Sequence, residues 1–275
     1  MTIKPFIFIA IATLMVASCG KGKRPPKREY DPISLSKPAK GDSAIYGLAC
    51  DGCTDSVIVL LPNSGGDPIT YNITNAKKKG QVFGSPKIGD WLGVIPDPKI
   101  KNGARLVVDL DELKGTWTFQ VMPKLKNVKL RAHRAIRKKL EAMSDSVKAL
   151  YMVPREYGFT LGRQSVASPV GMVRQVTIDN DSPVEYPKVK LYTEWHSYNG
   201  RLILIQGKYT FQGQVFNKKT IRDTLNLIYM KDDSLVLRNK KRIYSFHRQI
   251  DAHSANAKAN AAAMKQEQNA KQDLK

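Results

Sequence analysis

Short runs of apolar and β-branched residues, separated by Gly, Pro, Asn and Asp, fill the chain from residue 44 to about residue 113. Runs of this kind, bounded by turn-forming residues, predict β-strands. Short strands at such regular spacing are typical of a small β-barrel or sandwich, which we expect for this part of the chain. The predicted strands are residues 45–49, 56–61, 69–73, 81–83, 90–95 and 104–108.

A second series of short strands is predicted from residue 157 to about residue 248. The Asn199-Gly200 pair between two runs is the strongest short signal for a hairpin turn, and Asp232-Asp233 has similar turn chemistry. Sequential hairpins form an antiparallel meander, and with a further strand at 117–122 there are enough strands to close a barrel of about eight. The predicted strands are residues 157–161, 165–170, 173–178, 189–196, 201–206, 209–216, 224–230, 234–238 and 242–246.

Between the two β regions the pattern changes to a helical period. Ile136, Leu140, Met143, Val147 and Leu150 recur at steps of four and three, which places them on one face of a helix at about residues 129–151. This helix could lie on a membrane or bind an anionic polymer; equally, its apolar stripe could dock on a barrel while its charges stay solvated. The opposite, basic face carries Lys129, Arg131, Arg134, Arg137, Lys138, Lys139 and Lys148.

The N-terminus has the pattern of an export signal. Lys4 precedes an apolar run at residues 5–16, which is shorter than the ~20 residues that span a bilayer. The run ends in Val16-Ala17-Ser18-Cys19, which resembles the lipobox of bacterial lipoproteins. This resemblance implies a signal peptide at residues 1–18 and a Cys19 that carries diacylglycerol and palmitate. An ordinary signal peptide or an uncleaved anchor helix are the alternatives.

Residues 19–43 are basic and rich in Pro, and we expect them to form a tether. Gly20, rather than Asp, follows Cys19, and in the familiar sorting rule this favours the outer membrane. The basic residues after Cys19 differ from the acidic ones of surface-displayed lipoproteins, so we favour an orientation toward the periplasm. At the other end, residues 251–275 are dominated by Ala, Asn, Gln and Lys, which predicts either a frayed helix or disorder.

Composition and charge narrow the function. The chain has 275 residues, 42% of them hydrophobic, so it can bury a core, and its net charge of +21 predicts an electropositive surface. Lipopolysaccharide phosphates, anionic phospholipid, peptidoglycan and acidic glycans are suitable acidic partners, whereas a lipid-anchored envelope protein meets little nucleic acid. The four histidines are scattered and no Gly-x-Ser-x-Gly motif is present. We therefore expect no enzymatic activity, no metal site and no cofactor.

Cys50 and Cys53 form a Cys-x-x-Cys pair at the tip of a predicted hairpin, with Asp51-Gly52 as its turn. The pair lacks the helix N-terminus of a thioredoxin-like site, and no second cysteine pair completes a zinc site. A structural disulfide is the first expectation, with two free thiols and then redox chemistry as alternatives. A chain that does not reduce insulin would exclude the last.

Gly115-Thr-Trp117 resembles the Gly-x-Trp motif that opens lipocalins, and Arg248 lies where a lipocalin arginine packs across that tryptophan. Together with residues 202–204, 223–225 and 233–237 and the closing aromatic strand at 244–247, these motifs make residues 113–248 similar to the lipocalin-like domains of Gram-negative lipoproteins. This resemblance implies a barrel with Trp117 and Arg248 as its closing pair. The chain departs from the lipocalin pattern in two ways: a helix is inserted after the first barrel strand, and an extra β domain precedes the barrel. The turn at 87–90 in this extra domain is somewhat similar to that of an oligonucleotide/oligosaccharide-binding (OB) barrel.

Together these features predict a mainly β protein with a small β-barrel or sandwich at 44–113 and an antiparallel lipocalin-like barrel at 114–250, interrupted by one amphipathic helix. We expect a non-enzymatic envelope lipoprotein that binds a small hydrophobic or amphipathic ligand in the barrel. The alternative is an interaction module that binds an anionic envelope polymer or a partner protein through the basic helix. Candidate ligand-lining residues are Trp117, Phe119, Tyr192 and Trp195, which could equally be packed core.

Overall fold

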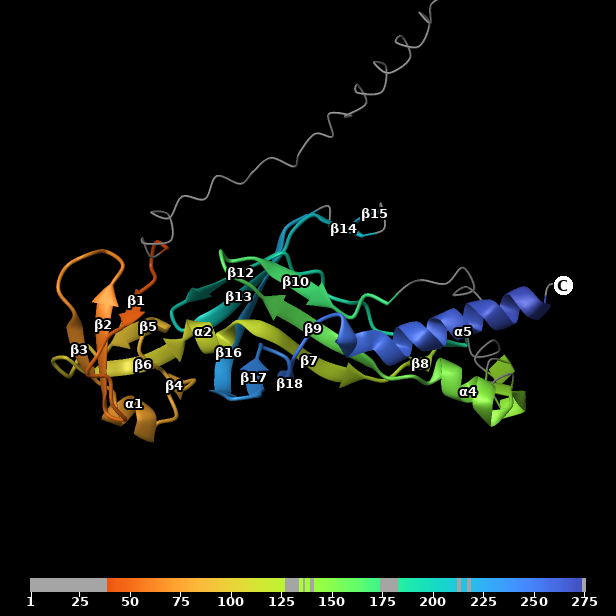
Figure 1. Cartoon of the computed structure of the whole chain (residues 1–275), viewed down its shortest axis with the longest axis horizontal. Coiled ribbons are helices and arrows are strands. Elements are labelled where there is room, and N and C mark those ends of the chain that lie inside the picture. The colour runs from red at the N-terminus through yellow and green to blue at the C-terminus, as the bar shows by residue number, and fades with distance from the viewer. Residues whose placement is uncertain are drawn as a thin grey trace, which may run out of the picture. The chain divides into compact units, whose positions relative to one another are not determined.

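The structure is a computed structural model, and it describes residues 39–126, 134–135, 137–138, 141–173, 183–211, 214–216 and 219–273. The predicted signal peptide, Cys19 and most of the predicted tether therefore lie outside the described residues. Strands dominate the described chain and form two large sheets (Figure 1). The expectation of a mainly β protein is confirmed.

The first sheet is six-stranded and lies in the N-terminal region, with strand order β3-β2-β1-β5-β6-β4. Only β4 pairs in parallel with its neighbour, and a short helix, α1 (Thr74–Lys78), follows β3. A parallel bridge joins Asn72 to Gly103, which precedes β6. The OB-like assignment stays a prediction. The strands are β1 (Ile45–Ala49), β2 (Val57–Pro62), β3 (Ile69–Asn72), β4 (Val82–Phe83), β5 (Trp91–Pro96) and β6 (Ala104–Asp109).

The connection between β1 and β2 is longer than the sequence predicted. Ala49 pairs with Leu60 across the two strands, so residues 50–56 form the connecting loop. Asp51-Gly52 is therefore not a two-residue hairpin turn between the strands, although Gly52 does adopt a positive φ of 93°. The backbone N–H of Cys50 donates to the Val59 carbonyl at 2.8 Å, which extends the pairing by one residue before the chain turns away.

The second sheet is an eight-stranded antiparallel barrel with strand order β10-β9-β7-β18-β17-β16-β13-β12. Its two edges meet at one end, where Ala167 N–H donates to the Thr193 carbonyl at 3.0 Å and Trp195 N–H donates to the Ser165 carbonyl at 2.9 Å. These bonds make the barrel nearly closed. The strands are β7 (Gly115–Val121), β9 (Arg155–Leu161), β10 (Ala167–Val170), β12 (Glu194–Tyr198), β13 (Arg201–Gln206), β16 (Ile221–Lys231), β17 (Ser234–Arg238) and β18 (Ile243–Gln249).

Local turn chemistry sets the register of two barrel hairpins. Asn199 and Gly200 have φ values of 50° and 69°, and Tyr198 pairs with Arg201 across them. Positive φ at both central residues is the geometry of a type I′ turn, whose twist matches that of paired strands. Lys231 likewise pairs with Ser234 across Asp232-Asp233.

Two predicted barrel strands differ in the structure. The predicted strand at 209–216 is a small separate hairpin of β14 (Tyr209–Phe211) and β15 (Gln214–Phe216), between which the sequence carries Gly213. The predicted strand at 189–196 begins only at Glu194, and in the segment before it the side chains of Lys190 and Tyr192 bond to Asp223. The predicted strand at 173–178 lies almost wholly outside the described residues.

The prediction of one continuous amphipathic helix at about 129–151 is wrong. Helical residues are found up to residue 142, and the helix is then interrupted, with Ser144 extended (φ −63°, ψ 155°) before α4 (Asp145–Tyr151). Serine followed by aspartate is a residue pattern common at helix starts, although the Ser144 side chain makes no cap hydrogen bond here. Of the predicted apolar stripe, Met143 and Leu150 are half-buried; Ile136 and Leu140 lie outside the described residues.

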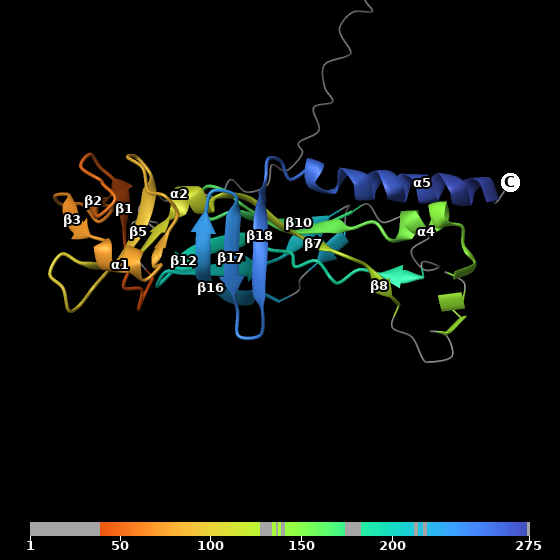
Figure 2. The ribbon, with the colours of Figure 1, turned by 90° about the horizontal axis from the view of Figure 1, so that it is seen from below.

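The C-terminal segment, for which the sequence left helix and disorder open, forms α5 (Ala257–Asp273). Figure 2 shows α5 running beside α4, and Gln266 Nε2 donates to the Leu150 carbonyl at 2.7 Å. Ala259 and Ala263 are buried against Val173. The remaining elements are α2 (Leu110–Leu113), the pair β8 (Lys124–Leu125) and β11 (Val184–Glu185), and the 3-10 helix η2 (Ser254–Asn256).

Candidate functional site: the two ends of the barrel

The barrel interior is a packed core over most of its length. Leu202 and Leu204 on β13, and Leu235 and Leu237 on β17, have no exposed area. Strand register places these leucines on the same inward row as Leu225, which faces Leu202 across the β13–β16 pair. An eight-stranded barrel is just wide enough for side chains to fill. The two ends, rather than the middle, therefore carry the chemistry that differs from an ordinary core.

One end is sealed by Trp117 and Arg248. The guanidinium carbon of Arg248 lies 4.1 Å from the centroid of the Trp117 ring, a cation–π contact, and Trp117 is fully buried. Arg248 also donates from Nη1 to the Lys114 carbonyl at 2.7 Å and from Nη2 to the Glu112 carbonyl at 2.6 Å. The indole N–H of Trp117 donates to the Leu113 carbonyl at 2.8 Å. This is the contact that the resemblance to lipocalins implied.

Gly115 is needed for this seal. Its φ is +117°, and a Cβ at this position would lie 2.6 Å from Arg248 Nη1. A side chain would therefore clash with the guanidinium that bonds to the neighbouring Lys114 carbonyl. The Gly-x-Trp motif thus combines a ring for Arg248 to cover with a backbone position that lets the guanidinium approach.

The other end of the barrel holds a carboxylate on the inward row. On β16 the exposed Arg222 and Thr224 alternate with Asp223, Leu225 and Leu227, which are half-buried or buried, and Asp223 pairs with the inward Leu204. We call this end, with Asp223 and its three side-chain partners, the polar end. The partners are Lys190, Tyr192 and Gln206.

All three partners donate to the same carboxylate oxygen, Oδ2 of Asp223. The Tyr192 hydroxyl donates at 2.7 Å, Lys190 Nζ at 2.8 Å and Gln206 Nε2 at 3.3 Å. Burial alone would raise the pKa of Asp223, but the hydrogen bonds from Lys190 and Tyr192 and the Lys190 charge hold this pKa below its usual value. Burial, reinforced by Asp223, moves the pKa of Tyr192 well above its usual value. At neutral pH the polar end therefore contains a charged carboxylate and a protonated tyrosine donor.

An aromatic cluster connects the polar end with the interior. The Phe159 ring centroid lies 6.0 Å from that of Tyr192 and 5.1 Å from that of Phe246. Phe119 lies 5.3 Å from Phe246 and 6.0 Å from Tyr244 by the same measure. Phe119 and Tyr244 are only partly buried. The cluster thus presents apolar ring surface next to a set of polar donors.

The structure separates the four predicted lining residues. Phe119 and Tyr192 belong to the aromatic cluster at the polar end, whereas Trp117 is at the sealed end beneath Arg248. Trp195 is 6% exposed and donates from Nε1 to the Gly162 carbonyl at 2.9 Å, beside the seam where the barrel edges meet. Asp223 was missed, although a carboxylate on the inward row of an alternating strand is a signal that the sequence contains.

The predicted basic face is only partly described: Lys129, Arg131 and Lys139 lie outside the described residues. Arg134, Arg137 and Lys138 are exposed. Arg137 forms an ion pair of 3.3 Å with Glu141, and Lys148 forms one of 3.4 Å with Asp145. Such exposed pairs within one helix contribute little to stability.

Cys50 and Cys53 are free thiols in the structure, which corresponds to the second of the predicted alternatives. Cys53 Sγ accepts from the Val59 N–H at 3.3 Å, so it packs against β2 rather than facing Cys50 across a turn. A disulfide between them stays a prediction. Within the described ranges, no three His, Cys, Asp or Glu side chains gather as metal ligands, and no helix has the length and apolarity to cross a membrane.

Comparison with known proteins gives one structural likeness. No protein-family model and no curated protein matches the chain. A lipocalin-like protein from Bacteroides thetaiotaomicron VPI-5482 matches 49% of this chain and 94% of its own, with 20% sequence identity and a TM-score of 0.25. A likeness at that TM-score carries no argument. The strand order of this chain shows a nearly closed eight-stranded antiparallel barrel, and the Trp117–Arg248 contact lies at one of its ends.

Proposed function

We propose that the chain is a non-enzymatic envelope lipoprotein whose barrel binds a small amphipathic ligand at its polar end. In this proposal lipid on Cys19 anchors the protein, at the outer membrane and facing the periplasm. The observation that carries the ligand proposal is the inward-facing Asp223 with its Lys190 and Tyr192 partners, next to the aromatic cluster. Apolar area with a few convergent polar groups is the usual composition of a small-molecule site.

The packed leucines limit where the ligand would lie. Because Leu204 and Leu237 are fully buried, the ligand does not enter the middle of the barrel. Its apolar part would instead cover the partly buried rings of Phe119 and Tyr244. Its polar part would meet Lys190, whose side chain is 48% exposed although it is paired with Asp223. A ligand with an anionic or hydroxyl group would share the Lys190 ammonium with that carboxylate.

Native mass spectrometry of the full chain, purified from membranes and again after denaturation and refolding, tests this proposal. We expect an additional mass that is lost on refolding and restored by added envelope lipid. An Asp223→Asn variant should reduce the occupied fraction, because the lysine loses its charged partner and its fixed position. Thr224→Ala changes the adjacent, exposed residue and is the matched control.

A chain without added mass in every preparation, also after addition of lipids, would overturn the proposal. Equal occupancy in the Asp223→Asn variant and the wild type would exclude the polar end as the binding site. Either result would turn attention to the alternative, an anionic partner bound by the exposed basic residues Arg134, Arg137 and Lys138.

A further inference from the structure

A cleft of about 610 Å³ lies outside the barrel, between the N-terminal sheet and the barrel strand β16. This volume is within the range of small-molecule sites. None of the residues of the polar end lines it, so it is a separate feature of the molecule. Its lining consists of residues 53–55, Ile58, Ile73, Lys77, Gly80, residues 82–87 and residues 228–231.

The floor of the cleft is apolar. Ile58, Ile73 and Phe83 are each at most 3% exposed, and Val82 is half-buried. Ile58 and Ile73 belong to the core of the N-terminal sheet, whereas Phe83 belongs to the core of the barrel. The cleft therefore opens onto the place where the two hydrophobic cores adjoin.

One wall of the cleft is formed by a β-bulge in β16. The pairing with β17 shifts between Leu227 and Tyr229, and Ile228 and Tyr229 are 40% and 48% exposed. Bulges redirect side chains and are frequent next to functional sites. Here the bulge leaves an isoleucine and a tyrosine as exposed apolar surface facing the cleft.

The two walls are held together by backbone contact. Gly84, which follows β4, donates from its N–H to the Met230 carbonyl on β16 at 2.9 Å. Its φ is +93°, and a Cβ there would lie 2.6 Å from the Cβ of Asp109. Glycine thus permits the chain after β4 to pass close to Asp109 at the end of β6, while the hydrogen bond to Met230 connects this segment to β16.

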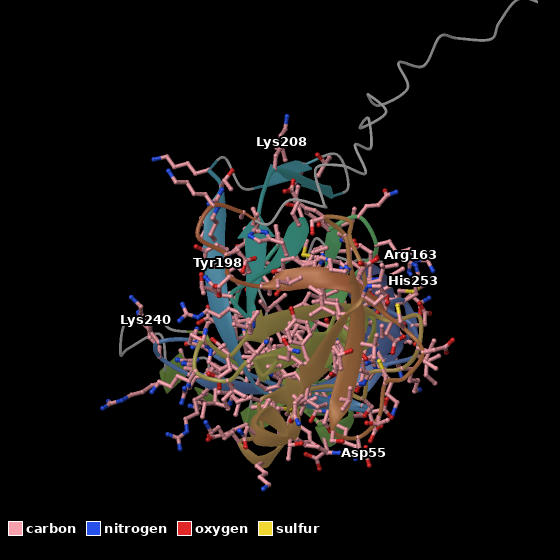
Figure 3. The ribbon with its side chains drawn as sticks, turned by 90° about the vertical axis from the view of Figure 1, so that its left-hand side faces the viewer. Asp55, Arg163, Tyr198, Lys208, Lys240 and His253 are labelled. Carbon is pink, nitrogen blue, oxygen red and sulfur yellow. The ribbon has the colours of Figure 1, made fainter. Side chains whose placement is uncertain are left out.

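The polar part of the lining is cationic. It contains three lysines, Lys77, Lys87 and Lys231, and one carboxylate, Asp55. Asp55 lies at the surface (Figure 3) and pairs with Lys77 at 3.0 Å. Across the part of the chain that the structure describes, no ion pair is found for Lys87 or Lys231. The lining therefore combines an apolar floor with a net positive charge, although the adjoining Glu112 and Asp90 carboxylates accept from the backbone N–H groups of Ser85 and Lys87.

From this combination we propose that the cleft binds an acyl chain that carries an anionic head group. The chain covers the floor and the exposed Ile228 and Tyr229, and the carboxylate or phosphate of the head group meets Lys87 and Lys231. Burial of methylene groups against the floor supplies most of the affinity. The lysines supply the preference for an anion.

The chain contains its own reporter for this site, because Cys53 lines the cleft whereas Cys50 is absent from the lining. The full chain in membrane vesicles of the expressing host is reduced and treated with a water-soluble maleimide, and mass spectrometry follows the two thiols separately. Oleate and oleoyl lysophosphatidate are the anionic probes, and methyl oleate is the neutral control. If oleate protects Cys53 at the lower concentration, the preferred head group is a carboxylate; if oleoyl lysophosphatidate does, it is a phosphate.

We expect saturating anionic probe to slow alkylation of Cys53 by about tenfold and to leave Cys50 unchanged, because only Cys53 lines the cleft. Lys87→Met and Lys231→Met should each weaken protection by about two- to fivefold, as for an ion pair with an exposed lysine. Lys101→Met, at an exposed lysine outside the cleft, is the matched control. Ile228→Asp should weaken protection by about tenfold or more, because its charge lies on the apolar wall.

Equal alkylation of Cys53 with and without both anionic probes would overturn the proposal. If methyl oleate protects Cys53 equally, the assignment of the anionic head group is wrong. The same holds if the anionic probes still fully protect Cys53 in a variant that combines Lys87→Met with Lys231→Met. Because Cys53 is not part of the polar end, this readout is independent of the mass measurement that tests the proposed function.

Discussion

The side-chain amide of Asn256 forms both hydrogen bonds that a neighbouring strand would form with Glu156. The backbone N–H of Glu156 donates to Asn256 Oδ1 at 2.9 Å, and Asn256 Nδ2 donates to the Glu156 carbonyl at 2.8 Å. Strand β10 pairs with β9 only from Gly158 onward, so this edge of β9 would otherwise be unpaired. Asn256 is 6% exposed, and it fixes the start of α5 to the barrel.

An Asn256→Ala variant should therefore release α5. It leaves the N–H and the carbonyl of Glu156 without these partners, and we expect the free energy of unfolding to fall by about 1–3 kcal/mol. Hydrogen exchange of residues 257–273 should accelerate more than that of the barrel strands. Lys258→Ala, at an exposed position, is the control. Unchanged exchange in α5 would show that the packing of Ala259 and Ala263 holds the helix without Asn256.

Substitution of Arg248 tests the seal of the barrel. Arg248→Ala removes the cation above Trp117 and two donors to the Glu112 and Lys114 carbonyls. We expect the free energy of unfolding in urea to fall by about 2–4 kcal/mol. Arg248→Lys should recover only a minor part, because an ammonium cannot reproduce the planar fork of donors. An equal loss for the exposed Arg242→Ala would mean that net charge, rather than the seal, is responsible.

Local signals made much of the barrel predictable. Asn199-Gly200 predicted its turn because the positive φ required at both positions suits few residue pairs. Alternation predicted β17, one face of which is buried in the core, and a continuous apolar run predicted β13. The contact between Trp117 and Arg248 was expected only through the resemblance to lipocalins, whose Gly-x-Trp motif here includes the Gly115 that the contact requires.

Contacts between distant residues were not predictable from the sequence. The seam is made by Ser165 and Ala167 with Thr193 and Trp195, and nothing in either segment specifies the other. The same reason explains the polar end, where Lys190 leaves the expected strand to reach Asp223, 33 residues away. At Ser144 the local cap signal was present, but the apolar period on both sides of it favoured one continuous helix.

Oxidation of Cys50 and Cys53 tests the disulfide that the sequence predicts. In the structure Cys50 N–H donates to the Val59 carbonyl and Cys53 Sγ accepts from the Val59 N–H, so both cysteines adjoin the same residue of β2. We expect the chain purified from an oxidising compartment without reductant to have lost two hydrogens in intact-mass measurement and to resist alkylation at both positions. Alkylation of both thiols in unreduced protein would show that they stay free, as in the structure.

Asp109 has the most perturbed acidity on the N-terminal side of the barrel. Its carboxylate is the N-cap of α2 and accepts from the N–H groups of Asp111 and Glu112, yet it is only 1% exposed. Burial raises the pKa of Asp109 to about 7, and the nearby charges of Asp90 and Glu112 add to the increase. The free energy of unfolding should therefore depend on pH through this residue.

The sign of that dependence follows from the raised pKa. Below about pH 4 the Asp109 carboxyl is protonated in both the folded and the unfolded state, so ionisation of this group does not lower the free energy of unfolding. Between about pH 4 and pH 7 this carboxyl ionises in the unfolded state but stays protonated in the folded state, so the free energy of unfolding falls as the pH rises. Asp109→Asn retains a cap acceptor without the charge. Urea unfolding should therefore show the variant gaining roughly 2–4 kcal/mol relative to the wild type between pH 4 and pH 7. Asp67→Asn, at an exposed carboxyl, is the control. If the difference in unfolding free energy between Asp109→Asn and the wild type stays constant from pH 4 to pH 7, Asp109 is not neutral in the folded protein.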